Sequence, residues 1–229
     1  MLEELKEKVL KANLDLVKNG LVLFTWGNVS AIDRASGYVV IKPSGVDYAD
    51  MKAEDMAVVD LDGNVKEGKY RPSSDTPTHL ELYKQHKEIG GIVHTHSTYA
   101  TAFAQAGRSI PTYGTTHADY FYGDIPCARC LEENEMDDYE KNTGVIINET
   151  FKDKDVVAIP ACLVAHHGVF AWGKAASEAV YHATVVEEVA KMAFITENLH
   201  PVIKRLPKHI ADKHYNRKHG KNAYYGQNN

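Results

Sequence analysis

The chain has 229 residues, a net charge of −5 and 25% charged residues, which is typical of a globular protein with one large domain. The negative net charge argues against general nucleic-acid binding, and no apolar run reaches the roughly 18 residues that a membrane span needs. The amino-terminal segment mixes acidic and basic residues without an apolar core, so we expect no secretory signal peptide and a cytoplasmic location.

The first part of the chain predicts a helix followed by strands. Apolar residues from Leu2 to Leu16 recur at alternating three- and four-residue steps, which predicts an amphipathic helix ending at Gly20. The segments LVLFT (21–25) and YVVIK (38–42) predict strands. Two further strands would meet at a hairpin turn at Asp62-Gly63 in the segment MAVVDLDGNVKEG.

Helices and strands alternate in the middle of the chain. Thr76-Pro77 has the residue types of a helix cap and first turn, and predicts a helix over THLELYKQH (78–86). GGIVHTH (90–96) predicts a short buried strand, and STYATAFAQA (97–106) predicts the helix that follows it.

The last part of the chain predicts strands and then helices. VVAIPACLVAHHG (156–168) predicts a long strand that would break at Pro160, and VFAW (169–172) predicts the next strand. A long helix is expected from Ala175 to about Asn198 and a shorter one from Pro207 to His219. Because strands occur in hairpins as well as between helices, we expect an α/β fold whose mixed, largely antiparallel sheet is covered by helices.

Histidines gather at the ends of two predicted strands. His94 and His96 are two residues apart on a strand, so their side chains point to one face and can share a metal ion. His166 and His167 would point to opposite faces, so only one of them can join the pair, and spacing does not choose between them. Asp75 precedes a predicted helix and is either an acidic partner or a residue that stabilises the helix dipole. Three histidines near strand ends with an open coordination position predict a catalytic divalent metal site.

Three short segments of small residues suit a phosphate group. They are Gly27-Asn28-Val29-Ser30, Pro43-Ser44-Gly45 and Pro72-Ser73-Ser74, with the positive charge of Lys42 nearby. Backbone N–H groups, hydroxyls and a helix amino terminus can together satisfy phosphate oxygens. Each segment alone is also compatible with an ordinary turn. The chain contains no glycine-rich nucleotide fingerprint, so a nicotinamide, flavin or nucleoside triphosphate site is not expected.

Cysteines and charges are unevenly placed. Cys127 and Cys130 form a lone CxxC, which predicts reduced thiols rather than a structural zinc site. Residues 201–229 contain seven Lys or Arg and one Asp, a net charge of +6, so the rest of the chain carries −11. Acidic residues cluster over 132–140. The basic tail and this acidic cluster are either two solvated surfaces, or the tail docks on an acidic surface of a neighbouring subunit.

Seven segments together carry a resemblance to a known family: TWGNVSAIDR, IKPSGVDY, RPSSDTPTHLELY, GGIVHTHSTYAT, TTHADYFYGDIPC, HHGVFAWG and DKHYNRKHGKNAYYGQ. They are similar to the class II aldolase and adducin-head family, and within it to the L-ribulose-5-phosphate 4-epimerase branch, over essentially the whole chain. HTH with a downstream HG marks the family broadly, whereas THADYFYG and AYYGQ are more specific to the epimerase branch. The resemblance implies one three-layer αβα catalytic domain over residues 1–229, in a cyclic homotetramer whose intersubunit active sites include the tail from about residue 207 to 229.

The resemblance also implies which residues form the site. The family's metal motif falls on Asp75, His94, His96 and His167, the histidine directly before Gly168, and implies zinc, with manganese or cobalt as alternatives. The acid/base pair falls on Asp119 and Tyr225. The substrate and phosphate motifs fall on residues from both ends of the chain: Gly27, Asn28, Lys42, Ser44, Gly45, Ser73, Ser74, His214 and Arg217.

The implied reaction is the isomerisation of L-ribulose 5-phosphate to D-xylulose 5-phosphate, with L-arabinose catabolism as its usual setting. It would proceed by metal-assisted cleavage of the C3–C4 bond and re-addition to the other face of the aldehyde. Aldolases of this family carry a Glu acid/base where this chain has Asp75, and the shorter side chain favours epimerisation. The alternatives are a sugar-phosphate aldolase of the same family, a metal-dependent hydrolase and a non-catalytic interaction domain.

Overall fold

An eight-stranded sheet lies at the centre of the computed structural model, which describes residues 2–225. The strand order is β4-β3-β2-β1-β5-β8-β7-β6. The strands are β1 (Asn28–Asp33), β2 (Tyr38–Ile41), β3 (Ala57–Val59), β4 (Val65–Glu67), β5 (Gly91–Thr95), β6 (Cys127–Ala128), β7 (Ala161–Val164) and β8 (Val169–Gly173). Every neighbouring pair is antiparallel except β6 and β7, which run parallel, so the predicted α/β fold with a mixed, largely antiparallel sheet is confirmed.

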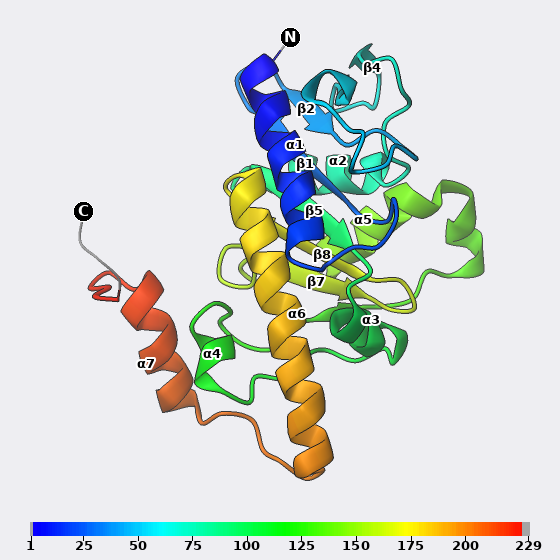
Figure 1. Ribbon diagram of the computed structural model, residues 1–229. Coiled ribbons are helices and arrows are strands. Elements are labelled where there is room, and N and C mark those ends of the chain that lie inside the picture. Colours follow the sequence, from blue (N-terminus) through cyan, green and yellow to red (C-terminus); the bar gives the residue numbers. More distant parts are fainter. Residues whose placement is uncertain (1, 226–229) are drawn as a thin grey trace.

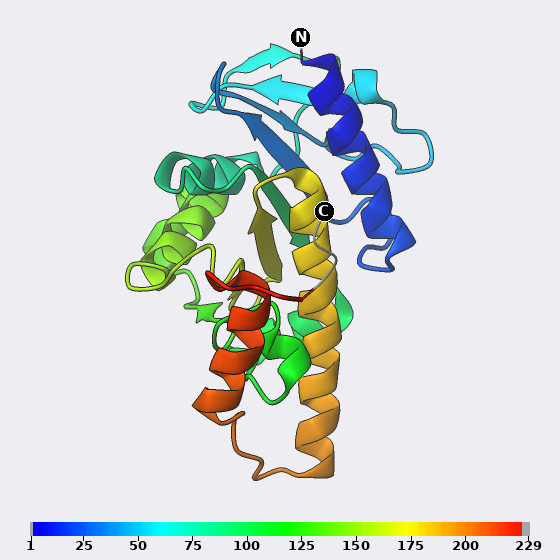
Figure 2. The same cartoon turned by 90° about the vertical axis from the view of Figure 1, so that its left-hand side faces the viewer.

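Helices cover both faces of this sheet (Figures 1 and 2). On one side, α6 (Ala176–Leu199) packs against β5, β8, α1 (Glu3–Lys18) and α3 (Thr98–Gln105). On the other side, α2 (Thr76–Gln85) packs against α5 (Tyr139–Thr150). The result is a three-layer arrangement in which the sheet is the middle layer.

The carboxy-terminal part of the chain returns to a short helix on the side of the molecule. After α6, the chain turns and forms α7 (Lys208–His219), which lies beside α4 (Thr115–Ala118) in both views (Figures 1 and 2). Two 3-10 helices, η1 (Ala53–Asp55) and η2 (Glu133–Asp138), complete the secondary structure of the described residues. None of the described helices is long and apolar enough to cross a lipid bilayer.

The core lies between the sheet and its helices, and the middle strands are buried on both faces. All five residues of β5 and of β8 are buried, as are all four of β7. The face of α6 that meets the sheet is made of small and β-branched residues: Ala176, Ala179, Val180, Ala183, Val186, Val189, Ala190 and Ala193. Short side chains on this face let the helix lie close to β5 and β8.

One strand prediction is wrong, and a second is correct in its break at Pro160 but too long. Residues 21–25 form an irregular turn, because only Leu21 and Val22 reach the core, while Phe24 is 77% exposed and has a positive φ. The predicted strand over 156–168 contains only β7. Pro160 has no N–H to donate, so the strand begins after it, and the chain turns at His166, whose φ is 61°.

The other elements that the sequence predicts lie close to their predicted positions, whereas β1, β6, α4 and α5 have no counterpart among the predicted elements. The turn at Asp62-Gly63 is present, and Gly63 supplies the positive φ that it requires. One detail differs at α2. Asp75 occupies the position before the first helical residue, Thr76 is the first residue, and no side-chain cap hydrogen bond is formed there.

Candidate metal centre

His94 and His96 lie at the end of β5, a central strand of the sheet. β5 pairs with β1 on one side and with β8 on the other, and His94 is opposite Asn28 on β1 and Phe170 on β8. The imidazole of His94 stacks on the Phe170 ring at 4.3 Å between centroids. Its Nδ1 lies 3.0 Å from the carbonyl oxygen of Val169, which can only accept, so Nδ1 carries the proton. This hydrogen bond leaves Nε2 of His94 unprotonated, so that its lone pair can bind a metal.

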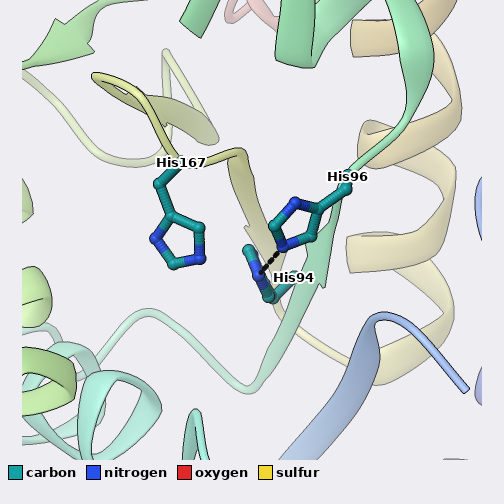
Figure 3. A group of neighbouring side chains, drawn as sticks. All are labelled: His94, His96 and His167. Atoms are coloured by element: carbon teal, nitrogen blue, oxygen red, sulfur yellow. Dashed lines mark hydrogen bonds between the residues drawn. The ribbon is translucent and has the colours of Figure 1, made fainter. Parts of the chain in front are cut away.

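His167 reaches the same point from the turn between β7 and β8. The turn is closed by the Val164 N–H donating to the Gly168 carbonyl at 2.9 Å and by the His167 N–H donating to the Val164 carbonyl at 3.0 Å. Because His166 adopts a left-handed conformation, the next side chain is turned back towards β5. The structure therefore brings His167, and not His166, to the other two histidines (Figure 3).

Gly168 is required where this turn approaches β5. A Cβ at position 168 would lie 2.7 Å from the carbonyl oxygen of Thr95 and 3.3 Å from Cε1 of His94. Gly27 has the same function on the opposite side, where a Cβ would lie 2.8 Å from the carbonyl oxygen of His94. Two glycines thus allow the backbone to close around the histidines.

The three imidazoles converge with the geometry of a shared ligand set. One ring nitrogen from each of His94, His96 and His167 lies within 4.8 Å of the other two. The Nε2 atoms of His94 and His96 are 3.0 Å apart, and the dashed line in Figure 3 joins them. Zinc bonds to nitrogen are about 2.0–2.1 Å long, so these atoms are close to the separation of two ligands on one ion.

The protonation states of the histidines also suit a cation. Burial, and then the neighbouring charges of His94 and His96, lower the pKa of His167 to about 3. Burial likewise lowers the pKa of His96, followed by the charge of His94. These two imidazoles are neutral at pH 7, the form that binds metals. The Nδ1 atom of His167 is buried without a hydrogen-bond partner among the described residues. The donor set therefore fits a divalent cation.

Asp75 lies beside this group but takes a different contact. Its Oδ2 accepts a hydrogen bond of 2.6 Å from Nδ2 of Asn28, and its carboxylate is not among the atoms that lie within 4.8 Å of one another. Burial opposes its ionisation, but the charges of His94 and His79 outweigh this effect and lower the pKa of Asp75. The side chain is thus an ionised carboxylate at the edge of the histidine group, and its role as a metal ligand stays a prediction.

The three small-residue segments meet at the histidines. Pro43 and Pro72 form an isolated antiparallel bridge, the Ser44 N–H donates to the Arg71 carbonyl, and the Ser73 N–H donates to the Lys42 carbonyl. One cavity of about 460 Å³ is lined by all three segments and by the histidines. Its lining is Thr25, Trp26, Gly27, Asn28, Lys42, Pro43, Ser44, Gly45, Ser73, Ser74, Asp75, His94, His96 and His167.

Lys42 gives this cavity a positive charge that no carboxylate neutralises directly. The side chain is buried, and among the ion pairs within residues 2–225 none includes Lys42. Its Nζ lies 4.8 Å from the centre of the Tyr48 ring and 3.4 Å from the carbonyl oxygens of Thr25 and Pro43. Burial lowers the pKa of Lys42, and the charge of Asp47 partly offsets this. A buried ammonium among hydroxyls and the amino terminus of α2 favours an anion.

Asp119 and the tail form a second cluster. The carboxylate of Asp119 accepts hydrogen bonds from Nε of Arg217 at 2.9 Å, from its Nη2 at 2.6 Å and from Nδ1 of His214 at 3.1 Å. Nε2 of His219 donates to the backbone carbonyl of Asp119 at 2.9 Å. Partial burial opposes ionisation, but the hydrogen bonds from Arg217 and His214 outweigh it and lower the pKa of Asp119. His214 and Arg217 thus contact the predicted acid/base residue within their own chain.

Tyr225 belongs to this second cluster. Its N–H donates to the Arg217 carbonyl at 3.1 Å, and its ring lies 4.7 Å from the guanidinium of Arg217 and 4.4 Å from Nζ of Lys218. The ring is 59% exposed. The basic tail therefore packs against the α4 segment of its own chain. The residues Gly226 and Gln227 of the AYYGQ segment lie outside the described residues.

The two clusters do not line one cavity in a single chain. Of the residues around the 460 Å³ cavity, none comes from α4 or α7 within the described part of the chain. The acidic segment 132–140 makes no ion pair with the described part of the tail. Glu135 pairs instead with Arg129 at 2.7 Å.

Some residues of the cavity have no separate sequence signal. Thr25 and Trp26 line it, although Thr25 belongs to the predicted strand 21–25 and Trp26 directly follows it. Tyr139, the first residue of α5, places its ring 5.9 Å from that of His167. Trp26 could be found only through the TWGN segment, and nothing in the sequence around Tyr139 indicates its position beside the histidines.

Comparison with known proteins identifies the family and the fold of this chain. Residues 7–194 match the family described as Class II Aldolase and Adducin N-terminal domain. An L-fuculose 1-phosphate aldolase of known structure is 28% identical, with a TM-score of 0.77 over 92% of this chain and 95% of that protein. YgbL from Klebsiella pneumoniae is 23% identical, with a TM-score of 0.75 over 93% and 99% of the two chains, and shares the fold. An l-fuculose-1-phosphate aldolase from Thermus thermophilus, 24% identical, also shares it, with a TM-score of 0.69 over 88% and 98%. Because the family match covers most of the sequence, this chain belongs to the class II aldolase and adducin N-terminal domain family.

Proposed function

We propose that the chain is an L-ribulose-5-phosphate 4-epimerase. The observation that carries the proposal is the cavity that combines three convergent imidazoles with Lys42 and the serine- and glycine-rich segments. This combination suits a sugar phosphate whose carbon–carbon bond is broken and re-formed. Family membership supports an enzyme that acts on such substrates.

The chemistry of the substrate favours bond cleavage over proton removal. The C4–H of a 2-ketopentose phosphate is not adjacent to the C2 carbonyl, so its loss gives no stabilised carbanion. Oxidation at C4 would need a nicotinamide, for which the chain has no fingerprint. Cleavage of C3–C4 instead gives the enediolate of dihydroxyacetone and glycolaldehyde phosphate, which can recombine on either face of the aldehyde.

The residues of the cavity have separate tasks in this reaction. A divalent cation bound by His94, His96 and His167, with Asp75 beside it, would supply a Lewis acid for the oxygens on C2 and C3. Lys42 and the small-residue segments would hold the phosphate, so that glycolaldehyde phosphate stays bound while its carbonyl turns. The phosphate contacts would come from Gly27, Asn28, Ser44, Gly45, Ser73 and Ser74.

Asp119 and Tyr225 are proposed as the proton donors and acceptors. Inversion at C4 needs one such group on each face of the aldehyde. Asp119 is ionised at neutral pH, because Arg217 and His214 stabilise its charged form, so it can accept the proton of one C4 hydroxyl. Tyr225 would give a proton to the C4 oxygen of the other epimer, and the roles exchange in the reverse direction.

A cyclic homotetramer would bring the two clusters together. In one chain, Asp119 and Tyr225 do not line the histidine cavity, so each active site would join the histidines of one subunit to the tail of the next. The largely exposed, acidic segment 132–140 contains Tyr139, whose ring lies beside His167, and its charge is opposite to that of the tail, which supports such a contact. The same segment would then receive the basic residues of the neighbouring subunit.

The test is product analysis with purified protein. Incubation with L-ribulose 5-phosphate should give D-xylulose 5-phosphate without added nicotinamide, lose this activity on chelation and recover it with zinc. Manganese and cobalt would be compared at the same step. Accumulation of dihydroxyacetone and glycolaldehyde phosphate would instead identify an aldolase, the second candidate, which the 28% identical L-fuculose 1-phosphate aldolase favours. If metal-loaded protein gave neither D-xylulose 5-phosphate nor the two cleavage products, both the epimerase and the aldolase proposals would be overturned.

A further inference from the structure

His96 lies in a short connection between a strand and a helix. β5 ends at Thr95 and α3 begins at Thr98, so only His96 and Ser97 separate the two elements. β5 is held by hydrogen bonds on both sides, but its last paired residue is Thr95. The position of the His96 backbone therefore depends on how the first turn of α3 is fixed.

The first turn of α3 is capped from a distance. The N–H groups of Tyr99 and Ala100 donate to the carboxylate of Glu187 on α6, at 2.9 and 3.1 Å from Tyr99 and 2.9 Å from Ala100. A carboxylate at a helix amino terminus satisfies unpaired N–H groups and interacts favourably with the helix dipole. Because α6 also packs against β5, Glu187 ties α3 to the layer that supports the metal ligands.

Ser97, the N-cap residue of α3, does not cap this helix with its side chain. Ser97 is at the N-cap position with extended backbone angles, but its side chain makes no cap hydrogen bond, and its Oγ is buried without a partner among the described residues. An N-cap side chain bonds to the second or third N–H of the helix, and here those belong to Tyr99 and Ala100. Glu187 has taken over the two groups that Ser97 would serve.

We infer that Glu187 is a positioning residue for the metal centre, which acts on His96 through the first turn of α3. It contacts no predicted ligand, and the inference rests on the metal site of the proposed function. Without the carboxylate, the two N–H groups would lose both of its oxygens and could share only the single hydroxyl of Ser97, so the turn that follows His96 would loosen. Metal ligands must be held within about 0.2 Å of their bonding distance, so this motion weakens binding.

Zinc affinity of the folded protein is the measurement that tests this role. Competition with a chromophoric chelator would give the dissociation constant for wild type, E187A, E187Q and the matched control E188Q, whose side chain is exposed on the same helix. Thermal unfolding of each variant would identify a temperature at which all of them are folded, and zinc binding would be measured at that temperature. We expect about tenfold weaker zinc binding for E187A, at the lower end of what loss of a supporting contact costs a metal site. E187Q should lie between E187A and wild type, and E188Q should equal wild type.

A second substitution separates positioning from general destabilisation. In E187A/S97D, an aspartate at the N-cap can accept from the same two N–H groups, so zinc affinity should return towards that of wild type. The visible spectrum of the cobalt-loaded protein should shift in E187A and return in the double variant, because it reports the ligand geometry. Wild-type zinc affinity in E187A, an equal loss in E188Q, or no rescue by S97D would overturn the inference. Absence of zinc binding by wild type would overturn the metal site itself.

Discussion

Substitution of Gly168 by alanine tests the packing of the histidine-bearing turn. The added Cβ would lie 2.7 Å from the carbonyl oxygen of Thr95, whereas ordinary contact begins at 3.4 Å, so the two backbones must separate by about 0.7 Å. The carbonyl of Thr95 is backbone in a strand that is paired on both sides, so it cannot move aside as a flexible side chain could. The turn that carries His167 must therefore move.

This displacement is large on the scale of metal coordination. Ligand distances tolerate changes of only about 0.2 Å, so a shift of about 0.7 Å removes His167 from its bonding position or strains the turn. Overpacking of this kind costs about 1–3 kcal/mol. We expect G168A to fold, to unfold at lower temperature and to bind zinc roughly 5- to 150-fold more weakly, since 1.4 kcal/mol corresponds to a factor of ten.

The assay is zinc competition against a chelator, with thermal unfolding of the metal-free protein measured alongside. G114A is the matched control, because a Cβ at Gly114 meets no atom within 4 Å and its φ is not positive. G168A with wild-type zinc affinity would refute the reasoning, because the turn would then tolerate the Cβ without moving His167. Equal loss in G114A would show that the effect is not local.

Three further outcomes follow from the structure. K42M should lower kcat/KM for the sugar phosphate roughly 10- to 100-fold, because a hydrogen bond to a charged group contributes about 1.5–3 kcal/mol. K18M, which changes an exposed lysine, should match wild type. An unchanged kcat/KM in K42M would remove Lys42 from the phosphate site. Burial lowers the pKa of His117 to about 4, so this side chain binds a proton more readily in the unfolded chain than in the folded one. Its contribution to the free energy of unfolding is therefore fully present above pH 6.5 and is lost as the pH falls towards 4. Over that pH range, the free energy of unfolding of metal-free H117Q, measured by urea titration, should therefore fall by about 3 kcal/mol less than that of wild type. H200Q, which replaces an exposed histidine, is the control. A pH dependence of H117Q equal to that of H200Q would contradict this. Deletion of residues 222–229 should abolish turnover while zinc content stays at the wild-type level, and undiminished turnover would exclude Tyr225.

The sequence predicts local features of the fold and site well. The two-residue spacing of His94 and His96 on an apolar run predicts that their side chains share a face, and the structure has them on and just after β5. Asp62-Gly63 predicts a turn because its geometry needs only neighbouring residues. Such features depend on contacts a few residues apart.

Features that depend on distant contacts are not predictable in this way. The choice of His167 over His166 is set by a left-handed residue in a turn, whereas the apolar pattern indicates a strand. Two of the small-residue segments, 43–45 and 72–74, meet because Pro43 pairs with Pro72, which is distant from it in the sequence. Apolar residues at 21–25 predict a strand, but Phe24 faces solvent, because the sheet already has β5 and β2 on the two sides of β1.

The central claim is that the histidine cavity and the Asp119 cluster act together in one epimerase centre, contributed by two copies of the chain. The direct measurement mixes two inactive variants, H96N and D119N, under conditions that allow subunits to exchange, and follows D-xylulose 5-phosphate formation from L-ribulose 5-phosphate. In a cyclic oligomer of randomly mixed subunits, about a quarter of the sites would combine an intact half from each chain, so about a quarter of wild-type activity should return. No recovery in exchanged oligomers would contradict the account.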